Sequence, residues 1–123
     1  MINIGQLLKD DSFYAGHHPV YKNRFLLCKD RDEPEEMTWD DANSIDGPFK
    51  LPTLNESAVL FAYRCALGFG VAYAWYWTSK ELLDHSAWQR NLDSGNQIWT
   101  DKSTISHIRL VRTVTQEELE ALV

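Results

Sequence analysis

The sequence predicts an α+β fold, built as a single domain over residues 1–123. Three observations predict this class. A length of 123 residues is typical of one domain with one core. The first half carries two helix-start signals, and the second half carries aromatic and alternating segments separated by turn residues. Helices and most strands therefore fall in separate stretches of the chain, as in α+β proteins.

The first two elements are expected to be a strand and a short helix. Residues 24–28 (RFLLC) form an apolar run between charged residues, which predicts a buried strand. Thr38 stands three residues before Asp41, the spacing of a helix-capping pair. A short helix is therefore expected over residues 39–44, and Gly47 and Pro48 follow it as breakers.

A longer helix is expected next. Thr53 and Glu56 repeat the capping spacing, and Gly68 is a natural helix end. Between them, apolar side chains recur near the helical period, at Leu54, Ala58, Phe61 and Cys65. Cys28 and Cys65 are too few and too distant to indicate a disulfide framework, so both are expected to be buried free thiols.

The second half is expected to form a meander that ends in a helix. Strands are predicted at 72–78, 86–92, 97–100 and 105–114. Residues 93–96 (DSGN) suit a tight turn because Gly and Asn tolerate positive φ, so the second and third of these strands should form a hairpin. Thr115 and Glu118 cap a helix over 116–122 that is too short to be stable alone, and we expect it to dock on its own domain.

Charge and hydropathy exclude several classes of partner. The formal net charge is −6 and the pI is about 5.1, which disfavours direct binding of nucleic acid because such binding needs Lys and Arg. No apolar run is long enough to cross a membrane, and no signal peptide is visible at the start, so the protein is expected to stay in the compartment where it is made.

Several short motifs occur in the order and at the spacings of a known family. They are Leu51-Pro52-Thr53 with Glu56, Tyr76-Trp77-Thr78-Ser79, Ala87-Trp88, Gly95-Asn96-Gln97, Asp101-Lys102-Ser103 and Arg109-Leu110-Val111-Arg112. In this pattern the chain resembles the Lcl C-terminal-like family of phages, prophages and bacteria. The upstream motifs resemble its phage-encoded branch: Tyr14-Ala15-Gly16, Phe25-Leu26-Leu27 and Met37-Thr38-Trp39 with Ala42. The resemblance covers about residues 14–113.

This resemblance implies a C-type-lectin-like fold, in which two helices pack on a twisted antiparallel sheet. It also implies a ligand-binding or adhesion module rather than an enzyme. No cofactor is expected, and the expected location is the cytoplasm of a host cell. The chain departs from the family pattern by continuing through residues 115–123, and it lacks the paired or oxidised cysteines of the related formylglycine-generating oxidases.

The hairpin provides the leading candidate site. Trp77 and Trp88 are expected in the core, with Trp75 on the same sheet face as Trp77, whereas Trp99 follows a polar turn and should be exposed. An exposed indole beside amides and carboxylates can supply both contact area and direction. The predicted ligand- or partner-binding residues are Trp88, Asn91, Asp93, Asn96, Gln97, Trp99 and Asp101.

The acidic segment 30–46 admits three interpretations. It is a solvated loop and helix start, or a calcium-binding loop, or an acidic face that docks on a basic protein. The third interpretation assigns the partner face to Asp30, Asp32, Glu33, Glu35 and Glu36. The acidic segment lacks the glycine and the spacing of an EF-hand calcium loop, so no bound metal is expected.

No catalytic constellation stands out. His17-His18 has no further His or Cys nearby in sequence, so it does not indicate a metal site. Ser86 beside His85, and Ser106 beside His107, would point to opposite faces of a strand and could not form a nucleophile–base pair.

The preferred interpretation is a phage- or prophage-encoded, non-enzymatic module that binds a protein or small ligand through its polar-aromatic hairpin. One alternative is an inhibitor of a host defence or nucleic-acid-binding protein that acts through the acidic segment. Another is a virion-associated adhesin. The protein is expected to be a monomer or a weak homo-oligomer, without membrane association.

Overall fold

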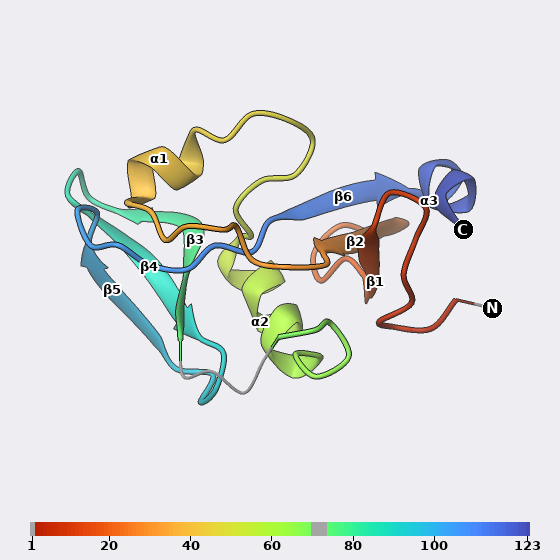
Figure 1. Cartoon of the computed structure of the whole chain (residues 1–123), viewed down its shortest axis with the longest axis horizontal. Coiled ribbons are helices and arrows are strands. Elements are labelled where there is room, and N and C mark those ends of the chain that lie inside the picture. Colours follow the sequence, from red (N-terminus) through yellow and green to blue (C-terminus); the bar gives the residue numbers. More distant parts are fainter. Residues whose placement is uncertain (1, 70–73) are drawn as a thin grey trace.

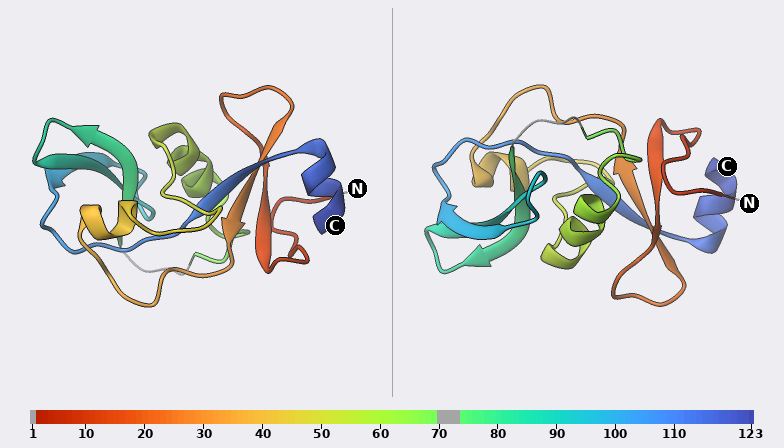
Figure 2. Two further views of the ribbon diagram at one scale, coloured as in Figure 1. Left: turned by 90° about the horizontal axis from the view of Figure 1, so that it is seen from above. Right: turned by 90° about the horizontal axis from the view of Figure 1, so that it is seen from below.

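The computed structural model describes residues 2–69 and 74–123. In this part of the chain the fold is α+β, with two antiparallel three-stranded sheets and three helices. The elements are β1 (Ser12–His17), β2 (Arg24–Lys29), α1 (Trp39–Asn43), α2 (Leu54–Ala62), β3 (Trp75–Leu82), β4 (Ser86–Asn91), β5 (Gln97–Asp101), β6 (Val111–Thr115) and α3 (Gln116–Leu122). The sheets lie at opposite ends of the molecule, with α2 between them (Figures 1 and 2).

The first sheet has the strand order β1-β2-β6, and the predicted strand at 24–28 is its central member. Both faces of β2 are buried. Phe25 and Leu27 pack into one hydrophobic cluster, and Leu26 and Cys28 pack into another. A continuous apolar run is therefore the pattern this strand needs, because alternate side chains enter separate cores.

Strand β1 was not predicted from the sequence. Its pairing with β2 is irregular between Tyr14 and His17, and Gly16 adopts a positive φ of 96° there. This β-bulge breaks the two-residue alternation by which a strand is recognised.

The second sheet has the order β3-β4-β5. The predicted hairpin is confirmed, since β4 and β5 pair in regular antiparallel register around the turn at residues 93–96. The predicted strand 72–78 is found as β3, but it begins at Trp75 and runs to Leu82, and residues 72–73 lie outside the described part of the chain. Trp77 is fully buried, as predicted, whereas Trp75 and Trp88 are only partly buried.

The single long strand predicted at 105–114 is wrong. Only β6 pairs with β2, and the preceding residues run beside β3 instead, where Trp77 N–H donates to the His107 carbonyl at 3.1 Å. The segment thus changes partner at about residue 110 and connects the two sheets (Figure 1). The helices do not cover one sheet together: α1 contacts the second sheet and α3 the first, whereas α2 contacts the second sheet and also places Leu60 in the hydrophobic cluster that contains Leu26 of the first.

All three predicted helix starts are confirmed. The Thr38 hydroxyl accepts a hydrogen bond from Asp41 N–H, and complete capping boxes begin α2 at Thr53 and α3 at Thr115. Helix α3 docks on its own domain, where Leu119 is buried and Lys9 N–H donates to the Leu122 carbonyl at 2.8 Å.

The end and the buried face of α2 differ from the prediction. The helix ends at Ala62, and turns rather than helix continue to Gly68. Its buried side chains are Glu56, Ser57 and Leu60, while Ala58 and Cys65 are exposed. The expectation of two buried thiols therefore holds for Cys28 alone. The recurrence of apolar residues did not predict the buried face of α2, because polar side chains from other segments hydrogen-bond to Glu56 and Ser57 and bury them.

None of the helices in the described residues is both long enough and apolar enough to cross a membrane.

Candidate functional site

The turn of the β4–β5 hairpin is fixed from within and from α2. The Asn91 carboxamide oxygen accepts hydrogen bonds from the backbone N–H groups of Asp93 (2.8 Å) and Ser94 (3.0 Å). Gly95 has a φ of 81°, and a Cβ atom there would lie 2.7 Å from the Phe61 ring of α2. Only glycine suits this position, because it must both adopt a left-handed conformation and leave room for the ring.

Arg90 links the same hairpin to the start of α2. Its guanidinium donates to the Ser57 hydroxyl (2.8 Å), the Gly95 carbonyl (2.9 Å) and the Leu54 carbonyl (3.4 Å). These acceptors are all neutral, and burial lowers the pKa of the Arg90 guanidinium. The hairpin is therefore attached to the rest of the molecule at its turn end, and the remainder of β5 extends away from this attachment.

The outer part of the hairpin presents an aromatic pair. Trp88 on β4 lies directly opposite Trp99 on β5, which places the two indoles on the same face of the sheet. Trp88 is partly buried, and Trp99 is 57% exposed, as the sequence predicted. Gln97 and Asp101 flank Trp99 on the same face and are exposed.

The remaining predicted residues divide into surface and interior. Asp93 and Asn96 are exposed at the turn. Asp101 is also exposed. Its carboxylate accepts hydrogen bonds from the backbone N–H of Ser103 (2.8 Å) and from the Ser103 hydroxyl (2.7 Å), and these bonds lower the pKa of the Asp101 carboxyl. The carboxyl is therefore ionised at neutral pH. Asn91 is fully buried and holds the turn, so it is unavailable to a ligand. The prediction of Asn91 as a binding residue is wrong.

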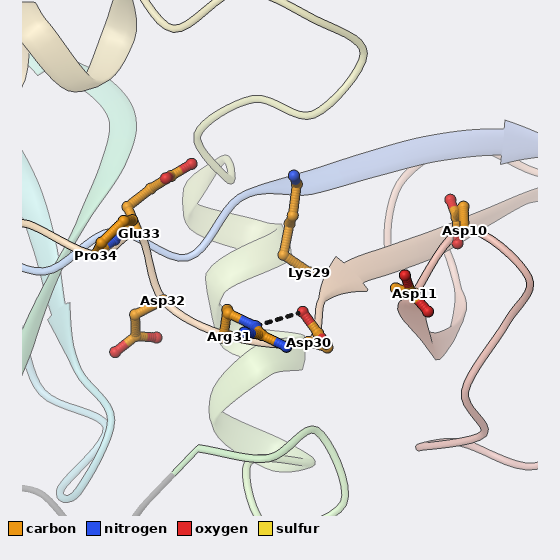
Figure 3. A pocket seen from close by; sticks show the side chains of 8 residues that line it. All are labelled: Asp10, Asp11, Lys29, Asp30, Arg31, Asp32, Glu33 and Pro34. Carbon is orange, nitrogen blue, oxygen red and sulfur yellow. Dashed lines mark hydrogen bonds and ion pairs between the residues drawn. The ribbon is translucent and has the colours of Figure 1, made fainter.

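A second candidate site is an open cleft of about 340 Å³ beside the predicted acidic segment (Figure 3). It is lined by Asp10, Asp11, Lys29, Asp30, Arg31, Asp32, Glu33 and Pro34. Asp10 and Asp11 come from the turn before β1, and the others come from the end of β2 and the segment that follows it. The fold thus adds two carboxylates that are distant in sequence.

Several carboxylates of the acidic segment 30–46 already have partners within the molecule. Arg31 donates two hydrogen bonds to Asp30, at 3.2 and 3.1 Å, and this contact lowers the pKa of the Asp30 carboxyl. Glu36 lies 3.1 Å from His107. Glu33 is partly buried and Glu35 is exposed.

Asp32 has a structural role that the sequence did not reveal. Its carboxylate accepts hydrogen bonds from Arg109 Nε (2.8 Å) and from the Tyr76 hydroxyl (2.5 Å). Burial, followed by the hydrogen bond to Asp32, raises the pKa of Tyr76. Asp32 was predicted to face a partner, but it faces these two interior side chains instead.

Arg109 is the residue that sequence reasoning missed. Its buried guanidinium also donates to the carbonyls of Lys29 (3.0 Å) and Leu67 (2.9 Å), and it lies 4.0 Å from the centre of the Phe69 ring. These contacts join the end of β2, the turns after α2 and the segment before β6. A lone arginine between Ile108 and Leu110 was the only sequence signal, since charged side chains are rarely buried unless paired.

Of the two adjacent histidines, His18 has a structural role. His18 Nε2 lies 2.5 Å from the Glu56 carboxylate, and its Nδ1 accepts hydrogen bonds from the N–H groups of Val20 and Tyr21, both at 3.1 Å. Both ring nitrogens are thus used to hold the β1–β2 loop against α2. Over residues 2–69 and 74–123, no cluster of three or more His, Cys, Asp or Glu side chains is placed to bind a metal ion.

No known protein family and no curated protein matches this chain in sequence comparison.

Proposed function

We propose that this chain is a phage- or prophage-encoded, non-enzymatic binding module that recognises a protein or small ligand through the β4–β5 face. The observation that carries the proposal is the exposed indole of Trp99, which stands opposite Trp88 on a hairpin fixed to α2. Tryptophan contributes more than most residues to binding when it is buried in an interface. The face is defined by Trp88, Gln97, Trp99 and Asp101.

The proposal includes the C-type-lectin-like fold and membership of the Lcl C-terminal-like family. The α+β class, the antiparallel sheets and the short capped helices support it. A non-enzymatic role is supported by the use of the acid–base pairs: His18 with Glu56 holds a loop, and Asp32 with Arg109 joins three segments. Ser106 accepts a hydrogen bond from Gln89 rather than approaching the neighbouring His107 as a nucleophile would.

Substitution of Trp99 tests the proposal. Tagged wild-type chain and the Trp99→Ala and Gln97→Ala variants are used to capture partners from infected host cells. The matched control is Tyr21→Ala, which removes an aromatic side chain of similar exposure, 62% against 57%, from the β1–β2 loop of the first sheet. We expect Trp99→Ala to weaken capture by about 30-fold or more, a typical loss for a central interface tryptophan. Unchanged capture by a folded Trp99→Ala variant would contradict the proposal.

A second candidate function is inhibition of a host defence or nucleic-acid-binding protein through the acidic segment 30–46, whose first residues line the cleft. The observation that favours it is the convergence of Asp10 and Asp11 on the segment after β2. Charge reversal at Glu33, Glu35 and Glu36 should then slow association steeply at low salt, because complementary charge mainly accelerates encounter. Trp99→Ala would leave that association unchanged, which separates the two functions.

A further inference from the structure

We infer that the occupant of the β4–β5 face is an extended, basic segment of a partner protein that pairs through its backbone with the free edge of β5. This inference rests on the proposed function and names the chemistry of the ligand. An added strand would extend the second sheet and place its side chains against Trp99 and Asp101.

The edge of β5 differs from the other outer edges of the two sheets. Those edges bond to neighbouring segments: Tyr14 N–H to Gln6 O (3.0 Å) beside β1, Trp77 N–H to His107 O (3.1 Å) beside β3, and Lys50 N–H to Val111 O (2.8 Å) beside β6. In the described residues, β5 pairs with β4 alone. It is therefore the strand whose second side is available to another chain.

The register identifies the backbone groups that point outward. Asn91 N–H donates to the Asn96 carbonyl, and Lys102 N–H donates to the His85 carbonyl, both at 2.8 Å. Hydrogen-bonded pairs alternate along an antiparallel ladder, and the β4–β5 register is regular. The groups of residues 98 and 100 therefore point toward β4, whereas those of residues 97, 99 and 101 point outward. The Asp101 carbonyl accepts from Thr104 N–H at 3.0 Å, but the other outward groups have no hydrogen-bond partner among residues 2–69 and 74–123.

The open edge lacks several of the features that usually prevent strand addition. Natural edge strands are protected by lysine, proline or a bulge. Residues 97–101 (QIWTD) contain neither lysine nor proline, and their pairing shows no irregularity. Ile98, Trp99 and Thr100 instead favour the strand conformation. The segment is thus a good template for an incoming strand.

Charge selects a basic segment over a second copy of this chain. The exposed charged groups of the hairpin are the carboxylates of Asp93 and Asp101. Two nearby cations are engaged elsewhere, because Arg90 is buried and Lys102 lies 2.7 Å from Glu81. The exposed Lys80 lies on β3, on the other side of β4 from the open edge. Antiparallel pairing of two copies centred on Trp99 would place Gln97 opposite each Asp101, which leaves both carboxylates without a cation, and the two chains would repel because each carries a net charge of −6. A Lys or Arg opposite Asp101, two residues from the side chain opposite Trp99, supplies the missing cation.

The test uses the peptide Lys-Val-Tyr-Val-Lys, whose symmetry places a lysine opposite Asp101 and the tyrosine opposite Trp99 in antiparallel pairing. Two N-methylated forms are compared on the wild-type protein. Methylation of the tyrosine nitrogen removes a donor that faces β5, and methylation of a valine nitrogen removes one that faces away. We expect the first peptide to bind about tenfold more weakly than the second, since one interfacial hydrogen bond and its close approach are lost.

Amide exchange provides the second readout. The unmodified peptide should slow exchange at Gln97 and Trp99, leave Ile98 and Thr100 unchanged, and bind more weakly when its lysines are replaced by glutamate or when salt is added. Equal affinity of the two methylated peptides would overturn strand addition. A dimer in analytical ultracentrifugation, with the Trp99 backbone N–H protected from exchange before any peptide is added, would show that the edge of β5 binds a second copy of this chain. That result would overturn the basic segment. If strand addition fails while partner capture still depends on Trp99, the proposed function stands without this inference.

Discussion

The two cysteines lie in different environments. Cys28 is fully buried on β2, and burial raises the pKa of its thiol to about 12. Cys65 is exposed in the turns that follow α2. Because the thiolate is the reactive form, only the exposed thiol should react in the folded protein.

Thiol titration with a disulfide reagent checks this difference. We expect one rapid equivalent per native chain, a second equivalent after denaturation, and no rapid reaction in the Cys65→Ser variant. Two rapid equivalents in the native wild-type chain would show that Cys28 is accessible and that β2 is not a central buried strand.

Substitution of Asp32 tests whether this residue of the acidic segment stabilises the fold rather than binding a partner. Removing its carboxylate leaves the buried Arg109 guanidinium without its anionic partner and frees the Tyr76 hydroxyl. We expect Asp32→Ala to lower the free energy of unfolding by about 1.5 to 3 kcal/mol, the range for hydrogen bonds to charged groups. Glu35→Ala, at an exposed neighbour, should change it by less than about 0.5 kcal/mol. Equal urea midpoints for the two variants would contradict the structural role of Asp32.

The carboxylate that caps α3 makes the stability of this helix depend on pH. Glu118 accepts a hydrogen bond from Thr115 N–H at 3.0 Å, and this contact lowers the pKa of its carboxyl. The folded-state pKa therefore lies below the unfolded value. The contribution to stability is complete above the unfolded pKa and is lost as the pH falls through the folded pKa.

The Thr115 amide resonance reports this titration directly. Its shift should follow an apparent pKa below that of an ordinary glutamate, and the Glu118→Gln variant should lose the transition. An apparent pKa at the ordinary glutamate value would show that the capping hydrogen bond does not persist in solution.

Local signals predicted some elements well. Each helix start depends on a hydroxyl and a residue three positions later, and the β4–β5 turn depends on Gly95, so neighbouring residues suffice. The end of α2 and the bulge of β1 depend on contacts made elsewhere in the chain. Leu67 enters the core in place of the predicted Cys65, and no periodic pattern in the helix indicates that.

For the whole molecule, the choice of partners between distant segments could not be predicted from local patterns. The segment before β6 leaves β3 and joins β2, which divides the expected single sheet into two. The exposure of Trp99 was predictable from the polar turn before it. The open edge of β5, the cleft that gathers Asp10 and Asp11, and the role of Arg109 were not, because each requires the tertiary arrangement.

Hydrogen exchange along β5 in the free protein tests most directly whether this strand presents an unpaired edge beside an exposed indole. We expect alternation, with rapid exchange at Gln97 and Trp99 and protection at Ile98 and Thr100, in a monomeric sample. Uniform protection along the strand would show that its outer edge is already occupied and that no partner strand can be added there.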